Sequence, residues 1–276
     1  MRLRLGNRLF DVTARAVVMG ILDRTPDSSG GRGTRVAMDL FLARAEQLVR
    51  EGADVLEVGG PTAAPGPDVT AGEEIDRVVP AVAALTSRFD VVVSVGSVRA
   101  VVARAAYQAG ASVGDDTSGF ADPDYLTAAA TAGASVVATR PGVGSGISTP
   151  LPDGDDVVAT VGSELVALAR EAEAAGIPAD RVIVDAGLAL GKTAHQSLAL
   201  LRGSDRLAGL GWPLLLSTSD AAYLGVVLGL DVAGRREAGL SATALGVTLG
   251  CRVVRARDVL GTRRVCDAVA AVLGGG

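Results

Sequence analysis

The sequence VVMGILDRTPDSS, residues 17–29, joins an apolar run to a polar segment that contains a proline. An uninterrupted apolar run of this length is typical of a strand in a parallel sheet, because helices cover both faces of such a sheet. Further along, apolar residues recur at the spacing of a helix. The stretch therefore predicts a unit of β-strand, polar loop and α-helix.

The same unit recurs to the end of the chain and predicts eight strands. They span residues 17–22, 54–58, 91–95, 112–115, 135–138, 181–184, 213–216 and 252–255. Strands that alternate with helices form parallel sheets, and eight of them can close into a (β/α)8 TIM barrel, an α/β fold. A doubly wound open sheet is the alternative. Residues 2–10 are expected to form a β-hairpin that covers the bottom of the barrel.

The length and the helix ends agree with this fold class. The chain has 276 residues, which is the usual size of one such barrel, so we expect a single domain over residues 1–276. Glycine just past a helix favours a left-handed cap, and Gly52, Gly110, Gly133 and Gly176 each follow a segment of helical pattern.

The composition excludes several classes of function. The net charge is −5, so no overall basic field favours nucleic acid or an anionic membrane. No apolar run is long enough to span a membrane or to act as a signal peptide. The two cysteines do not make a disulfide framework. We therefore expect a cytoplasmic protein whose partner is a small molecule.

Chemistry in such barrels is carried by the loops that follow the strands. Four segments at those places resemble dihydropteroate synthase. They are MGILDRTPDSS (19–29), EVGGPTAAPG (57–66), VDAGLALGKT (184–193) and VVRARDV (253–259). The resemblance covers almost the whole chain. It implies a barrel whose mouth binds a pterin pyrophosphate with magnesium, and in which p-aminobenzoate displaces the pyrophosphate.

Some positions match the family pattern. Asp185 matches the pterin-binding Asp, and Arg255 matches the Arg that stacks on the pterin and helps to bind phosphate. Asp116 matches the Asp of an Asn-Asp pair, and Thr25 remains in the first loop.

More positions depart from that pattern. The changes lie in the magnesium, phosphate and pterin positions of the family, and the residues now found there are Asp23, Thr62, Ala63, Ala64, Gly96, Asp115, Thr139, Arg140, Leu190, Ser219, Asp220, Ala221 and Arg257. One group of changes makes the mouth larger, less cationic and more apolar, namely Gly96, Ala63, Ala64, Ala221, Ala222 and Leu190. Each lost charge-assisted contact is worth roughly 1.5–3 kcal/mol, so pyrophosphate affinity should fall on the order of 100-fold. Adaptation to a bulkier, less polar ligand and random decay both remain open.

The candidate site follows from these matches. Asp185, Asp115 and Arg255 are the candidate catalytic residues. The candidate substrate-binding residues are Asp23, Thr25, Glu57, Thr62, Asp116, Arg140, Leu190, Ser219 and Arg257. No metal site is assigned, and Asp23 is the one candidate ligand for magnesium, which would be needed only if a pyrophosphate substrate is retained. Alternatively, Asp185 and Arg255 form a structural ion pair.

Three functions remain open. The first is an enzyme with a changed substrate, in a specialised biosynthetic pathway, that performs transfer, elimination or cyclisation. The second is an authentic but divergent dihydropteroate synthase, and the third is a non-catalytic dimeric scaffold. Members of the family dimerise through the later helices, and the small residues Ala242, Ala244 and Gly246 are compatible with close packing there.

Overall fold

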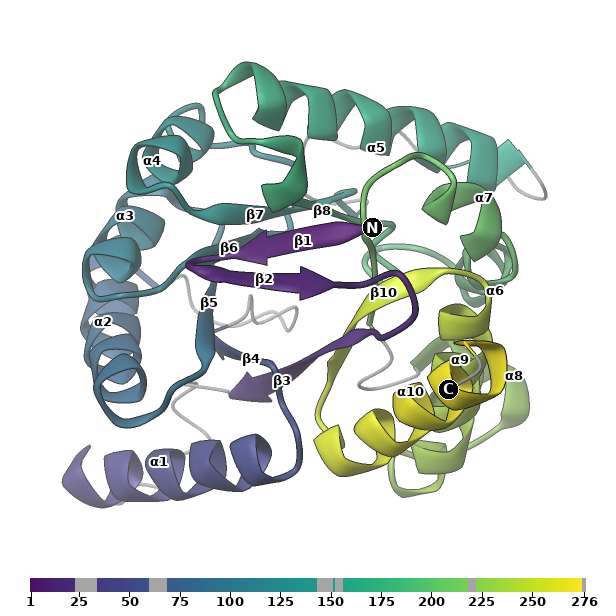
Figure 1. The fold of residues 1–276 in the computed structure, drawn as a ribbon, viewed down its shortest axis with the longest axis horizontal. Coiled ribbons are helices and arrows are strands. Elements are labelled where there is room, and N and C mark those ends of the chain that lie inside the picture. Colours follow the sequence, from purple (N-terminus) through teal and green to yellow (C-terminus); the bar gives the residue numbers. More distant parts are fainter. Residues whose placement is uncertain (23–33, 60–68, 143–150, 152–155, 218–221, 275–276) are drawn as a thin grey trace.

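The computed structural model describes residues 1–22, 34–59, 69–142, 151, 156–217 and 222–274. Eight parallel strands close into a barrel, with helices packed around it (Figure 1). Each strand from β3 to β10 pairs with the next one in sequence, and β10 pairs with β3. The predicted barrel is confirmed, and the open sheet was the wrong alternative.

The strands of the barrel lie within one residue of the predicted bounds at each end. They are β3 (Val17–Leu22), β4 (Val55–Gly59), β5 (Val92–Gly96), β6 (Val113–Asp116), β7 (Ser135–Thr139), β8 (Val182–Asp185), β9 (Leu214–Ser217) and β10 (Cys251–Ala256). The helices are α1 (Thr34–Arg50), α2 (Ala71–Arg88), α3 (Ala100–Gln108), α4 (Tyr125–Ala132), α5 (Asp156–Ala174), α6 (Ala194–Arg202), α7 (Ser204–Ala208), α8 (Ala222–Leu228), α9 (Arg236–Thr248) and α10 (Val259–Gly274).

The predicted glycine caps are also confirmed. Gly52, Gly110, Gly133 and Gly176 all have positive φ, from 62° at Gly133 to 112° at Gly110. At Gly133 the backbone is left-handed and its N–H donates to the last turn of α4. A side chain there would strain the backbone, which explains the residue type.

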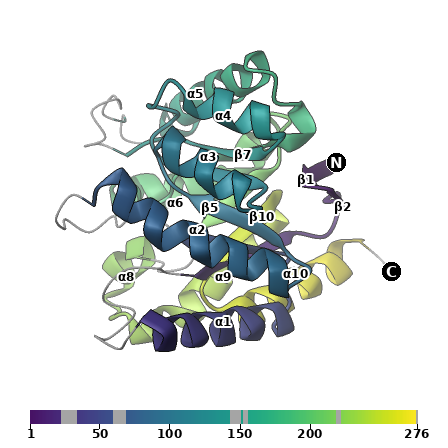
Figure 2. The same ribbon diagram turned by 90° about the vertical axis from the view of Figure 1, so that its left-hand side faces the viewer.

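The N-terminal hairpin closes the bottom of the barrel. Strands β1 (Arg2–Leu5) and β2 (Arg8–Asp11) pair antiparallel, and Figure 2 shows them at the same end of the molecule as both termini. Leu3 and Leu5 are fully buried in one cluster with the apolar lumen residues. Those lumen residues are Val17, Met19, Val55, Val92, Val113, Val137, Ile183, Leu215 and Val253. The open end for a ligand is therefore the opposite one.

The small residues of α9 serve packing within this chain. Ala242 and Gly246 are buried, and a Cβ atom added at Gly246 would collide with Leu216 of β9. The expectation that these residues pack against a second subunit is therefore wrong for Ala242 and Gly246. Dimer formation itself stays a prediction.

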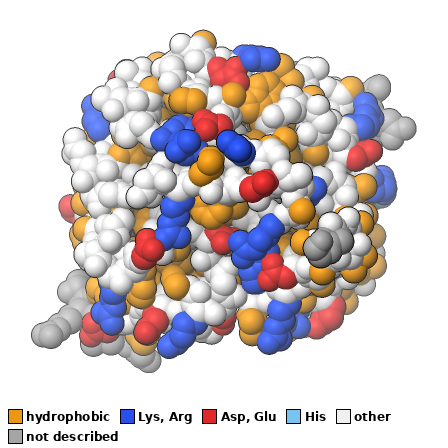
Figure 3. Space-filling model, in the orientation of Figure 1, with side chains coloured by type: hydrophobic (Ala, Val, Ile, Leu, Met, Phe, Trp, Pro, Cys, Tyr) orange, Lys and Arg blue, Asp and Glu red, His pale blue; other side chains and the backbone are white. Residues whose placement is uncertain are grey.

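On the face that carries the hairpin, acidic and basic side chains are interspersed (Figure 3). Among the described residues, no helix combines the length and the apolar character needed to cross a membrane.

Candidate functional site

A polar layer lies directly above the apolar lumen. Side chains alternate between the two faces of a strand, so the second residue after a lumen residue also faces the lumen. On four strands this step leads from an apolar to a charged side chain, as from Val113 to Asp115 and from Val253 to Arg255. The layer comprises Glu57, Ser94, Asp115, Thr139, Asp185, Ser217 and Arg255, which come from seven different strands.

Arg255 is the centre of this layer. Its Nη1 atom lies 2.5 Å from Oδ2 of Asp115 and 3.5 Å from Oε1 of Glu57. Its Nη2 atom lies 3.6 Å from Oδ2 of Asp185, and its Nε donates to Oγ of Ser217 at 3.4 Å. The structure therefore brings together all three candidate catalytic residues and Glu57. The predicted ion pair between Asp185 and Arg255 is present, but Asp115 is the closer partner.

Burial controls protonation in this layer. It raises the pKa of Glu57 well above its usual value, against the attraction of Arg255. It also raises the pKa of Asp185, which Arg255 again opposes. Burial disfavours the charged form of Arg255, yet Asp115, Glu57 and Asp185 raise its pKa overall. A permanent cation is thus surrounded by carboxyl groups, two of which hold their protons more tightly than usual.

Several oxygen atoms of the layer lack hydrogen bonds from the described residues. They are Oγ of Ser94, Oδ1 of Asp115, Oγ1 of Thr139, and also Oε1 of Glu57 and Oδ2 of Asp185, which still form ion pairs with Arg255. A buried polar atom without a hydrogen bond costs about 1–3 kcal/mol. Such atoms gathered at one level of the lumen indicate a surface built to face a polar ligand or water.

Arg140 lies beside this layer, at the end of β7. It is fully buried, its N–H donates to the carbonyl oxygen of Asp185 at 2.8 Å, and its Nε donates to Oε2 of Glu164 at 2.6 Å. The charge of Arg140 is thus paired with a carboxylate of α5. No sequence signal singled out Glu164, because it is one of several acidic residues on that helix.

Asp116 faces away from Asp115, as expected for adjacent residues of a strand. Its Oδ1 atom accepts hydrogen bonds from N and Oγ of Ser118 and from N of Phe120, at 2.6, 2.7 and 3.2 Å. Burial raises its pKa. Asp116 thus stabilises the turn after β6, and its role in substrate binding stays a prediction.

The loop between β8 and α6 folds over Asp185. Oδ1 of Asp185 accepts a hydrogen bond from N of Gly187 at 2.7 Å, and the Leu190 N–H donates to the Gly187 carbonyl at 3.0 Å. Nζ of Lys192 donates to the carbonyl oxygens of Gly187 and Leu190 at 2.8 and 3.2 Å. Burial and nearby Arg140 lower the pKa of Lys192 to about 8. Lys192 was not among the predicted site residues, although its being the only lysine was a signal.

Arg257 is the one remaining candidate among the described residues. Arg257 is exposed, and its carbonyl oxygen accepts a hydrogen bond from Arg44 of α1 at 3.0 Å. Asp23, Thr25, Thr62 and Ser219 lie outside the described residues.

The described residues do not fit a magnesium ion. Within them, no group of three His, Cys, Asp or Glu side chains is placed to hold a metal. Glu57, Asp115 and Asp185 converge instead on the guanidinium of Arg255, whose positive charge would repel a second cation.

Comparison with known proteins identifies the family. The family model described as "Pterin binding enzyme" matches residues 19–257. A Mycobacterium leprae protein named "Inactive dihydropteroate synthase 2" is 40% identical over 94% of this chain and 91% of its own length. The Bacillus subtilis protein named "Dihydropteroate synthase" is 32% identical over 95% of this chain and 90% of its own. The Xanthomonas albilineans dihydropteroate synthase solved with 4-aminobenzoic acid superposes with a TM-score of 0.90, at 32% identity, over 100% of this chain and 99% of that one. This chain therefore belongs to the pterin binding enzyme family, as a divergent member of the dihydropteroate synthase group.

Proposed function

We propose that this protein is an enzyme of the dihydropteroate synthase fold that no longer joins a pterin pyrophosphate to p-aminobenzoate. It acts instead on a bulkier and less polar small molecule, which binds above the polar layer at the mouth of the barrel. The observation that carries the proposal is the convergence of Asp115, Glu57 and Asp185 on Arg255.

The state of Arg255 supports the loss of pyrophosphate binding. A phosphate-binding arginine must offer uncompensated positive charge, but three carboxyl groups lie within 3.6 Å of this guanidinium. An incoming pyrophosphate would have to compete with these carboxyl groups for the guanidinium. Compared with the family pattern, this chain also lacks cationic or polar anion ligands. Ala63 and Ala64 stand at such positions in the second loop, and Asp220 stands at one in the seventh.

The same layer supports proton-transfer chemistry. A general acid needs a carboxyl group that is still protonated near neutral pH, and burial raises the pKa of both Glu57 and Asp185 in that direction. Either group could protonate a leaving group, and Arg255 could stabilise a developing oxyanion beside it. Transfer, elimination and cyclisation in a specialised pathway all use such steps.

The names of relatives support the loss of the synthase reaction. The Mycobacterium leprae relative and a Mycobacterium tuberculosis relative, the latter 37% identical, are both named inactive dihydropteroate synthases. They are more similar to this chain than the Bacillus subtilis protein, at 32% identity.

Calorimetry tests the proposal in two stages. The protein is titrated with 6-hydroxymethyl-7,8-dihydropterin pyrophosphate and Mg²⁺, and then with p-aminobenzoate. We expect neither the pterin pyrophosphate nor p-aminobenzoate to bind when the ligand is present below millimolar concentration. A thermal-shift screen of larger heterocycles should then find stabilising compounds whose effect is lost in Asp185→Asn. Micromolar binding of the pterin pyrophosphate would overturn the proposal, and so would turnover to dihydropteroate.

Two alternative functions are each favoured by one observation. An authentic synthase is favoured by the 32% identity to the Bacillus subtilis protein, and growth of a synthase-deficient strain on this gene would establish it. A dimeric, non-catalytic scaffold is favoured by the inactive relatives. It would show no ligand in the thermal-shift screen and no response to Asp185→Asn.

A further inference from the structure

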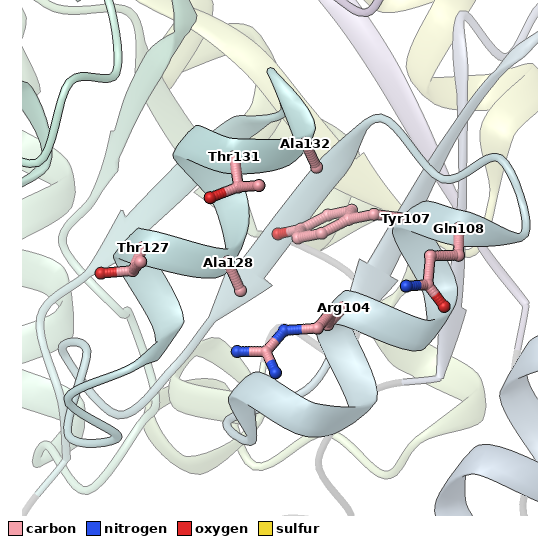
Figure 4. A pocket seen from close by; sticks show the side chains of 7 residues that line it. All are labelled: Arg104, Tyr107, Gln108, Thr127, Ala128, Thr131 and Ala132. Carbon is pink, nitrogen blue, oxygen red and sulfur yellow. The ribbon is translucent and has the colours of Figure 1, made fainter.

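A cavity of about 500 Å³ lies between α3 and α4, on the outer helical layer of the barrel. Three of its residues come from α3 and four from α4, as Figure 4 shows. They are Arg104, Tyr107, Gln108, Thr127, Ala128, Thr131 and Ala132. The volume lies within the range of small-molecule sites. None of these residues belongs to the polar layer at the barrel mouth.

The cavity carries one charged side chain, that of Arg104. In Figure 4 its guanidinium extends from α3 toward α4, where Thr127 and Ala128 lie. Arg104 is exposed, and it forms no ion pair with any residue in the part of the chain that the structure describes. The hydroxyl groups of Thr127 and Thr131 add donors on the α4 side. This edge of the cavity therefore favours a single negative charge.

Apolar groups also line the cavity. Tyr107, Ala128 and Ala132 contribute a phenol ring and two methyl groups. Tyr107 is only 9% exposed, and its hydroxyl lies against Gly114 of β6, where an added Cβ would collide with it and with the hydroxyl of Tyr125. Burial raises the pKa of Tyr107, so the ring stays uncharged. A planar apolar group can pack against the exposed atoms of these three side chains.

We propose that this cavity is a second binding site, for a small aryl carboxylate. A carboxylate matches the planar fork of a guanidinium, and one cation balances its single charge. A phosphate monoester would bring about two charges to a cavity with one cation, and the volume is too small for a folded peptide. The aromatic body would lie on Tyr107 and the two alanines.

Binding of benzoate, followed by ligand-observed NMR and calorimetry, tests the proposal. We expect saturable binding to the full-length protein, and binding of neutral benzamide at least about tenfold weaker. Arg104→Gln should weaken benzoate at least about tenfold, whereas Arg202→Gln, an exposed arginine on α6, should leave it unchanged. Ala132→Leu should weaken benzoate binding at least about tenfold because the larger side chain narrows the cavity, and Ala132 is exposed, so the fold should tolerate the change.

Three results would overturn the site. The first is the absence of saturable benzoate binding. The second is a benzoate affinity in the Arg104→Gln and Ala132→Leu variants that equals the affinity of the unchanged protein. The third is loss of binding in Asp185→Asn with full binding in Arg104→Gln, which would place benzoate at the barrel mouth. Loss of benzoate binding in Arg104→Gln, with full binding in Asp185→Asn, would support the site in the cavity. This result would hold whether or not the proposed function at the barrel mouth is correct.

Discussion

The guanidinium of Arg255 at the end of β10 lies 2.5 Å from the carboxylate of Asp115 at the end of β6. These strands are four places apart in either direction around the closed barrel, so the ion pair spans the lumen. Glu57 and Asp185 approach the same guanidinium from two further strands. The cluster thus ties opposite walls together beneath any ligand in the mouth.

Removing the cation from this cluster should destabilise the fold strongly. In Arg255→Met, three buried carboxyl groups would lose their shared counter-ion, and we expect a loss of about 3–5 kcal/mol in the free energy of unfolding at pH 7. The double variant Arg255→Met, Asp115→Asn should recover part of the lost free energy of unfolding, because one buried charge disappears. Denaturant unfolding measures both. Arg50→Met serves as control, since Arg50 is mostly exposed and pairs only with Glu46 among the described residues. A loss below about 1 kcal/mol in Arg255→Met would show that the carboxyl groups do not depend on Arg255.

Neutralising Glu57 should stabilise the protein at alkaline pH. Burial raises the folded-state pKa of Glu57 above the ordinary value of 4.5, so the folded chain keeps a proton that the unfolded chain releases. The stability contributed by this group is present below pH 4.5 and is lost as the pH rises toward the folded value. Glu57→Gln should remove that loss and raise the free energy of unfolding at pH 8, with no gain at pH 4. Each tenfold difference in proton affinity between the folded and unfolded chain is worth about 1.4 kcal/mol. Denaturant unfolding at both pH values measures the effect, and a gain of equal size at pH 4 would contradict the prediction.

Strand positions could be predicted from the sequence, whereas the partners within the site could not. Apolar runs located every barrel strand within a residue, because the burial of both faces leaves a strong pattern. Asp115 and Asp116 were grouped as one pair, although alternation along β6 separates them onto two faces. Glu164 and Lys192 reach the site through a helix and a loop whose packing no local pattern encodes.

Lys192 should titrate far below an ordinary lysine. Burial and Arg140 lower its pKa from 10.5 to about 8, while its Nζ stays bonded to two carbonyl oxygens. Labelling the protein with ¹³C-lysine reports on Lys192 alone, because the chain has no other lysine. The ¹³Cε resonance should show a midpoint near pH 8, and Lys192→Arg identifies the signal by its loss. A midpoint near 10.5 would mean that the loop after β8 exposes the amine. Because the folded-state pKa is lowered, this group should also add stability as the pH rises from 8 to 10.5.

The apolar surface around α8 should form a dimer interface. Val226 and Leu228 on α8 are 74% and 57% exposed, and Val232 just beyond the helix is 77% exposed. Exposed apolar residues that lie close together in sequence are a candidate protein contact, so we expect sedimentation velocity to show a dimer. Val226→Asp would place a charge in the interface and should raise the dissociation constant about 30-fold or more. The control is Leu9→Asp, which places the same charge at an exposed leucine of the hairpin and should leave the dimer intact. A monomer at every concentration, or equal effects of the two substitutions, would remove α8 as the interface.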